Sequence, residues 1–152
     1  MSPDRRIDIT DERFKTPQNH DAIEFIRRNN PSAHSDPGDV LFKLGKSIAG
    51  AHSYCPSPAT YAYVVLHTSA NRIFAIAFGM QGLAFRLAPA ALAAALADHG
   101  APAPDIGADW VSFPPFNARG EVGAWDRLER WGGEAFAHAR AEGDSESARN
   151  PR

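Results

Sequence analysis

The chain has 152 residues, of which 43% are hydrophobic and 22% are charged. This length and composition predict a single folded domain with a packed core, and they exclude a largely disordered chain. Sixteen Lys and Arg residues against 18 Asp and Glu residues leave a formal net charge of −2. That charge disfavours nucleic acid as a partner, although a local basic patch would still be compatible with one.

The location of the protein follows from what the sequence lacks. No apolar run approaches the roughly 18 residues of a membrane-spanning helix. The single cysteine, Cys55, cannot form an intramolecular disulfide, and no signal-peptide pattern opens the chain. We therefore expect a cytoplasmic protein without membrane contact.

Two helices are predicted in the first third of the chain. Thr16 and Pro17 give a helix-start signal, and apolar residues at helical spacing follow as far as about Asn29. Asp36 and Pro37 repeat the signal before an apolar stripe that ends at Gly50. The proline-containing stretch 52–60 is predicted to be a loop.

The middle of the chain changes to the period of β-strands. Strands are predicted at 61–67, 72–78 and 83–87, joined by short turns into an antiparallel meander. An Ala-rich helix should follow from Ala88 to Gly100, then a proline-rich link, a fourth strand at Trp110–Phe113 and a last helix from about Trp125. The expected fold is α+β: a three-stranded antiparallel meander plus a fourth strand, packed against helices on one face.

Domain boundaries are predicted from the distribution of apolar residues. Residues 1–15 and 142–152 offer little apolar surface and are expected to be flexible tails whose removal costs little stability. Residues 16–141 are expected to form the single domain.

The strand register decides which side chains share a face. Centring the two hairpin turns at 69–70 and 80–81 pairs Val65 with Phe74 and Phe74 with Leu87. Large side chains then share the face that should meet the helices: Tyr61, Tyr63, Val65, Phe74, Ile76, Phe78, Leu83, Phe85 and Leu87. The other face is formed of small or aliphatic residues, with Arg86 beside Ala75 as its only charge. This face is either covered closely by an Ala-rich helix or left as a shallow floor for a ligand or partner. Arg86 either extends its charge into solvent past its apolar neighbours or contacts an anionic group, which is our hypothesis.

Complete catalytic or metal-binding patterns are absent from the sequence. His52 and Cys55 supply two zinc ligands where a structural site needs four, so no metal or cofactor is predicted. Cys55 as a nucleophile needs a nearby base, for which His52 and His67 are candidates, but a dispensable cysteine is favoured. Candidate binding residues are Arg86, His52, Tyr54 and His67.

Two strand sequences carry a family resemblance. Arg72-Ile73-Phe74-Ala75 on one predicted strand and Leu83-Ala84-Phe85-Arg86-Leu87 on the next, within the order of elements from Asp21 to Ala141, resemble the YjbR and TfoX N-terminal-like proteins. The resemblance implies a small α+β fold that binds DNA or proteins, and it transfers no catalytic residues. The acidic net charge and a helix added before the meander depart from that family, which argues against DNA.

Two functions follow from these features. The favoured one is a non-catalytic binding or regulatory module whose partner is a protein or a small anionic ligand. The alternative is a small enzyme or small-molecule-binding protein that uses the His52–Cys55 loop together with His67 and Arg86. Convergence of these side chains on one cavity would favour the alternative, and their dispersal would favour the module.

Overall fold

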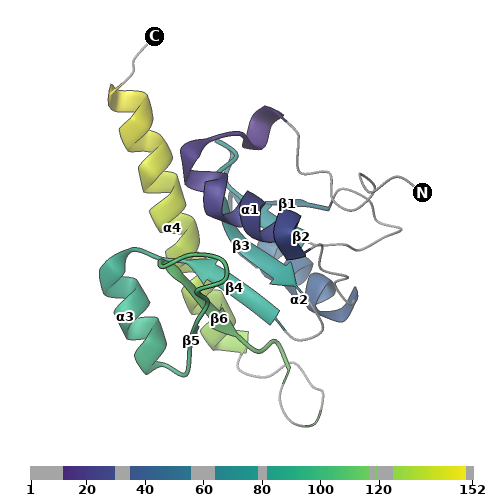
Figure 1. The fold of residues 1–152 in the computed structure, drawn as a ribbon. Helices are drawn as coiled ribbons and strands as arrows, with labels where there is room; N and C mark the ends of the chain where they lie inside the picture. Colours follow the sequence, from purple (N-terminus) through teal and green to yellow (C-terminus); the bar gives the residue numbers. More distant parts are fainter. Residues whose placement is uncertain are drawn as a thin grey trace, which may run out of the picture.

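The computed structural model describes residues 12–29, 35–55, 64–78, 82–116, 119 and 125–149 (Figure 1). The α-helices are α1 (His20–Asn29), α2 (Ser35–Ser47), α3 (Pro89–Ala97) and α4 (Trp125–Arg149). Two 3-10 turns, η2 (Glu12–Phe14) and η3 (Pro17–Asn19), lead into α1. The strands are β1 (His52–Tyr54), β2 (Val64–His67), β3 (Ile73–Phe78), β4 (Gly82–Arg86), β5 (Ala101–Pro102) and β6 (Trp110–Phe113).

The strands form one six-stranded antiparallel sheet in the order β1-β2-β3-β4-β6-β5. The α+β class, the meander and the strand at Trp110–Phe113 are confirmed. Two strands lie where loops were predicted, β1 in the stretch 52–60 and β5 at the start of the proline-rich link. Both are edge strands too short to show an alternating pattern in the sequence. β5 also contains Pro102, which an edge strand tolerates.

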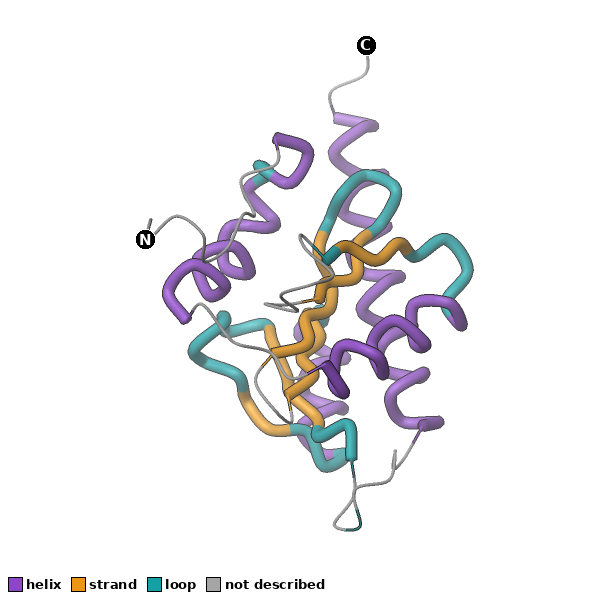
Figure 2. The backbone as a smooth tube through the Cα atoms, turned by 90° about the vertical axis from the view of Figure 1, so that its right-hand side faces the viewer, coloured by secondary structure: helices purple, strands orange, loops and turns teal. Residues whose placement is uncertain are grey.

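Helices cover both faces of the sheet, and the prediction of helices on one face was wrong. Figure 2 shows the sheet nearly edge-on, with α1 on one side and the long α4 on the other. The first core, which α2, α3 and α4 cover, consists of Val40, Leu41, Leu44, Val64, Leu66, Phe74, Ala75, Ala77, Leu83, Phe85, Leu87, Ala95, Val111, Phe113, Leu128, Trp131, Ala135 and Ala139. The second core, which η2 and α1 cover, consists of Phe14, Ala22, Ile23, Phe25, Ile26, Val65, Ile73, Ile76, Ala84, Ile106 and Trp110.

The predicted register was wrong in both hairpins. Val65 lies opposite Ile76 rather than Phe74, and Ala75 lies opposite Phe85 rather than Arg86. On the other edge of β4, Arg86 pairs with Trp110 of β6. Bulky residues therefore lie on both faces of the sheet. Burying them all requires a helix on each face, since either face left uncovered would expose large apolar side chains.

The turn between β2 and β3 explains the register of the first hairpin. A two-residue turn was predicted, but the chain turns over Thr68 to Arg72, with Asn71 in the left-handed region at φ 62° and Thr68 N–H bonded to Arg72 O at 3.0 Å. Asn adopts this conformation more readily than most residues. The register also shifts between Leu66 and His67, where Phe74 is the extra residue on β3. This bulge brings Phe74 into the first core.

The ends of the folded domain lie outside the predicted boundaries. Phe14 is fully buried in the second core, and α4 continues through Glu142 to Arg149. Phe14 and Glu142, which both fall in the predicted tails, therefore pack against the rest of the domain. The prediction of flexible tails otherwise falls on 1–11 and 150–152, which lie outside the described residues.

Candidate functional site

Two histidines pair across the edge of the sheet. His52 on the edge strand β1 lies directly opposite His67 on β2, with ring centroids 5.5 Å apart and an interplanar angle of 20°. His52 is exposed, whereas His67 is only 5% exposed. Nδ1 of His67 lies 2.8 Å from the carbonyl oxygen of Thr68. Because a carbonyl only accepts hydrogen bonds, Nδ1 carries the proton and Nε2 is left with its lone pair.

The 3-10 turn η2 packs against this pair. The Phe14 ring lies 5.1 Å from the His67 ring in an edge-on arrangement and 5.0 Å from the Tyr54 ring. The Arg13 guanidinium stands over both Phe14 and Tyr54, at 4.7 and 4.8 Å from their centroids. We call Arg13, Phe14, His52, Tyr54 and His67 the histidine cluster.

Burial favours the neutral form of His67. Desolvation lowers the pKa of His67 below its ordinary value, against the opposing hydrogen bond to Thr68, and the nearby charges of His52 and Arg13 lower it further. A neutral imidazole with a fixed tautomer can act as a base or as a metal ligand.

Arg86 lies in an internal ion-pair network. Its Nε donates to Asp109 Oδ2 at 2.8 Å, Nη2 donates to Glu142 Oε2 at 2.8 Å, and Nη1 donates to Glu142 Oε1. The Arg86 side chain is 12% exposed and that of Glu142 is 24% exposed. Burial alone would raise the pKa of Glu142, but the hydrogen bonds and charge of Arg86 hold it below its ordinary value. The same ion pairs raise the pKa of Arg86 despite its burial. The network fastens the last third of α4 to the end of β4.

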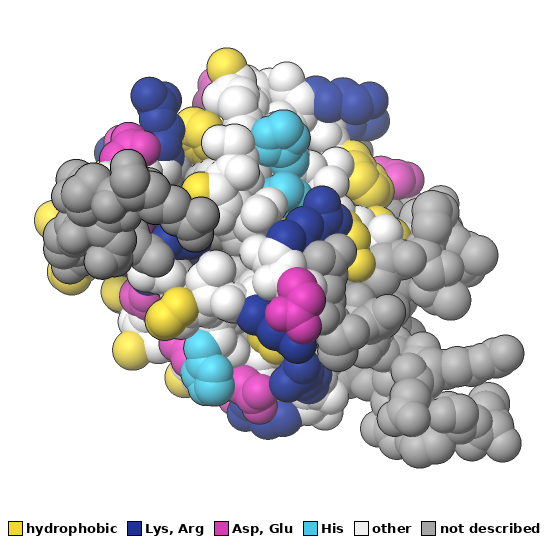
Figure 3. All heavy atoms as spheres, turned by 90° about the horizontal axis from the view of Figure 1, so that it is seen from above, with side chains coloured by type: hydrophobic (Ala, Val, Ile, Leu, Met, Phe, Trp, Pro, Cys, Tyr) yellow, Lys and Arg dark blue, Asp and Glu magenta, His cyan; other side chains and the backbone are white. Residues whose placement is uncertain are grey.

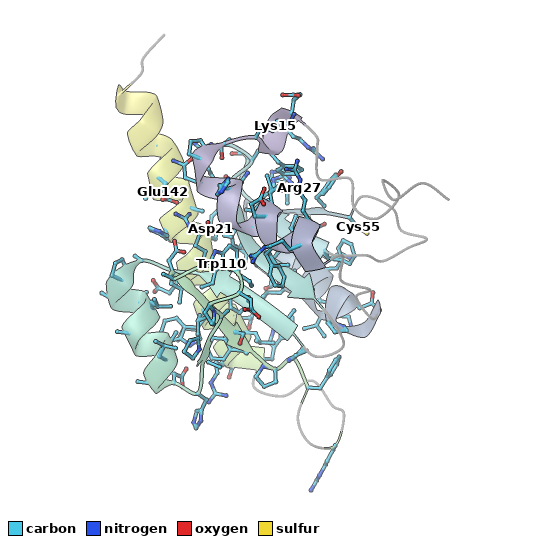
Figure 4. All side chains as sticks on the ribbon, in the orientation of Figure 1. Lys15, Asp21, Arg27, Cys55, Trp110 and Glu142 are labelled. Atoms are coloured by element: carbon cyan, nitrogen blue, oxygen red, sulfur yellow. The ribbon has the colours of Figure 1, made fainter. Side chains whose placement is uncertain are left out.

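A pocket of about 480 Å³ opens over η3 and α1. Its lining residues are Lys15, Thr16, Pro17, His20, Ile23, Glu24 and Arg27. Lys15 and Arg27 lie near each other in Figure 4, whereas Glu142 lies apart from them on α4. Figure 3 looks onto the end of the molecule and shows histidine side chains with Lys and Arg side chains nearby. The pocket, which we call the α1 pocket, is therefore lined by cationic groups around an apolar residue, Ile23.

Thr16 gives the α1 pocket an unusual polar group. Thr16, part of the predicted helix-start signal, lies at the N-cap position of η3 without a side-chain capping bond. Its Oγ1 is buried and has no hydrogen-bond partner. A buried hydroxyl in this state costs free energy, and a ligand or water recovers it only if the Thr16 side chain turns toward the pocket.

The four predicted binding residues lie in two separate parts of the structure. His52, Tyr54 and His67 come together, while the contacts of Arg86 described here are with Asp109 and Glu142 on the far side of β3. None of the four lines the α1 pocket. Cys55 is half-buried and packs against the first core, whereas Phe14 of the histidine cluster lies in the second core. A role for Arg86 in binding a ligand stays a prediction.

Sequence reasoning missed Arg13 and Lys15, because both fall in the segment that was assigned to a tail. The signal that was available is Phe14, a large apolar side chain just before a helix start. Such a residue often packs back onto the helix that follows it. Arg27 and His20 were assigned only to a helix, and their shared pocket depends on how η3 joins α1.

Comparisons with models of known protein families, with curated proteins and with solved structures found no match to this chain. The resemblance to the YjbR and TfoX N-terminal-like proteins stays a prediction.

Among the described residues, no helix has both the length and the apolarity needed to cross a bilayer. Within that same part of the chain, no three His, Cys, Asp or Glu side chains are grouped so as to hold a metal ion.

Proposed function

We propose that this protein is a non-catalytic binding module for a small anionic ligand, which it binds in the α1 pocket. The observation that carries the proposal is the lining of this pocket: Lys15, His20 and Arg27 line it together with Thr16, whose hydroxyl is buried without a partner. The volume of about 480 Å³ is within the range of small-molecule sites. The dispersal of the predicted residues between two places also favours a module over an enzyme.

The charges of the pocket support an anion. Glu24 is the one acidic residue of the lining, and it lies 3.6 Å from Arg27 with both side chains nearly half exposed. Lys15 pairs with Glu12, whose side chain is 85% exposed. Exposed pairs of this kind contribute little, so a ligand anion can replace them at low cost. Ile23 and Pro17 offer apolar contact, which favours an anion with a short hydrocarbon part.

Titration with inorganic phosphate and with hexanoate tests the proposal. Backbone amide resonances of residues 15–27 should shift on addition of at least one of these anions. Arg27→Gln and Thr16→Val should each weaken the binding, Arg27→Gln by about tenfold or more, because a charged hydrogen bond contributes about 1.5–3 kcal/mol.

Lys43→Gln is the matched control, since Lys43 is an exposed cation on α2, at the opposite face of the sheet. Its substitution should leave the affinity unchanged. The proposal fails if neither anion shifts these resonances, or if Lys43→Gln weakens binding as much as Arg27→Gln does.

The second candidate is a small enzyme that uses the histidine cluster. The fixed tautomer of His67, with Nε2 unprotonated, is the observation that favours it. Hydrolysis of p-nitrophenyl acetate faster than in buffer, and its loss in His67→Asn, would support this candidate. A wild-type rate no higher than that of buffer would count against it.

A further inference from the structure

The separation of His52 and His67 matches that of two imidazoles on one metal ion. A metal lies about 2.1 Å from each imidazole nitrogen and so about 3.2 Å from each ring centre, which places the centres of two ligands at a tetrahedral angle about 5 Å apart. The observed centroid distance is 5.5 Å. The two rings are nearly parallel, at 20°, whereas each imidazole holds a metal in its own ring plane, so the His52 ring must turn toward His67. His52 is exposed on an edge strand and has room for this change of rotamer.

The surroundings of His67 are those of a metal ligand. Histidines that bind metals usually donate their other N–H to a carboxylate or a backbone carbonyl, which fixes the ring. Nδ1 of His67 donates to Thr68 O in this way. The Thr68 backbone is itself held, because its N–H bonds to Arg72 O and its hydroxyl accepts from the N–H groups of Ala70 and Arg72. Nε2 is therefore the nitrogen available to a metal.

We propose that His52 and His67 form a two-histidine site for a divalent transition metal such as Zn²⁺, Ni²⁺ or Cu²⁺, with water in the remaining positions. Imidazole is the protein ligand that suits these metals. A site with only two protein ligands holds the ion exchangeably and leaves positions open for a small ligand. Cys55, which the sequence places beside His52, packs against the first core and is not part of the site. This proposal is independent of anion binding in the α1 pocket.

Arg13 opposes the metal and provides a sharp test. Its guanidinium stands over Phe14 and Tyr54 within the histidine cluster, so Coulomb repulsion should act against a cation bound at His67. Replacing Arg13 with Gln should therefore tighten metal binding several-fold. A surface histidine that binds metal by itself, elsewhere on the chain, would not respond to this change.

The experiment is a calorimetric titration of the full chain with ZnCl₂ at pH 7.5, followed by NiCl₂ with NMR observation of the histidine ring protons. We expect one zinc ion per chain and selective broadening of His52 and His67 by Ni²⁺. His52→Ala should weaken zinc binding at least tenfold, since the loss of an outer-sphere partner alone costs about 10–100-fold. His52 is exposed on an edge strand, so this variant should fold.

His99→Asn is the matched control, because His99 is exposed and has φ 69°, a conformation that Asn tolerates. It should bind zinc as the wild type does. The proposal is overturned if His52→Ala keeps wild-type affinity, if His99→Asn loses as much as His52→Ala, or if Arg13→Gln does not tighten binding.

Discussion

The two faces of the sheet are held in different ways. The first core joins α2, α3 and α4 to the sheet through a continuous set of aliphatic and aromatic side chains. The second core is smaller, and hydrogen bonds between Asn19 of η3 and the backbone of Asn71 and Ile73 help to hold η3 and α1 against the sheet. Buried polar residues of the described chain, Asn19, His67, Thr68 and Arg72, all lie in η3 or around this turn.

This difference predicts that the stability of the domain and its response to protons and ligands depend on different faces of the sheet. Apolar packing is insensitive to pH and to small ligands, so the first core should determine the stability of the domain. The second face contains the histidine cluster and borders the α1 pocket, and its polar contacts respond to protons and ligands. The following predictions test this division, starting with the largest expected effect.

Trp131→Ala should cost about 3–5 kcal/mol of unfolding free energy, because it leaves a cavity in the first core. It also removes the hydrogen bond from Nε1 to Asp98 Oδ2, 2.9 Å long. Urea denaturation measures the loss. Leu96→Ala on α3 is the control, since Leu96 is 39% exposed and should cost under about 1 kcal/mol. Equal losses in the two variants would contradict the role assigned to the first core.

Asn19→Ala should cost about 2 kcal/mol, because it leaves a buried N–H group unpaired on the second face. Asn19 Oδ1 accepts from Ile73 N–H at 2.7 Å, while Nδ2 donates to the carbonyls of Phe14 and Asn71. Hydrogen exchange at Ile73 should accelerate in the variant, while exchange at Leu83 in the first core should change less. A uniform acceleration across the sheet would mean that the two faces unfold together.

A double-mutant cycle of Arg86→Met and Glu142→Gln should give a coupling of about 1–3 kcal/mol, since both partners are largely buried. The pKa of Glu142 is lowered from 4.5 in the folded state. Its stabilising effect is therefore complete above about pH 4.5 and is lost as the pH falls through the lower folded value. The difference in unfolding free energy between the wild type and Glu142→Gln should shrink below pH 4.5. A difference that is constant with pH would contradict the ion pair.

His67 should produce the smallest effect, a loss of stability on mild acidification. Its pKa is lowered from 6.5, so the unfolded chain takes up a proton at a higher pH than the folded chain does. Stability is complete above pH 6.5 and decreases below it. Denaturation between pH 7.5 and 5.5, with EDTA present, should show this slope in the wild type and a weaker slope in His67→Gln. His99→Asn should keep the wild-type slope, and a slope unchanged in His67→Gln would contradict the prediction.

Much of the fold could be predicted from local sequence patterns. The apolar periods and the proline start signals located α1, α2, α3 and α4, and the β-branched and aromatic runs located β2, β3, β4 and β6. These signals are local because they reflect which face of one element is buried. The edge strands β1 and β5 are too short to have such a period, and their pairing depends on a neighbour elsewhere in the chain.

The candidate site could be predicted only in part. His52 and Tyr54 were selected from the predicted loop and His67 from the end of the predicted strand 61–67. Antiparallel pairing of β1 with β2 brings them together. Arg86 was selected from a β3–β4 register that puts it beside Ala75, whereas the structure pairs Ala75 with Phe85. The α1 pocket was not predicted, because it depends on the burial of Phe14, which brings Lys15 and Thr16 close to α1.

By itself, the sequence determined a single α+β domain, the position of most helices and strands, and which residues are apolar enough to be buried. Only the tertiary structure decided the register, the covering of both faces, and the partners of Arg86 and His67. The physical reason is the distance along the chain over which each effect acts. Propensity and periodicity act within one element, whereas a turn of different length or a one-residue bulge changes which side chains meet across the whole sheet.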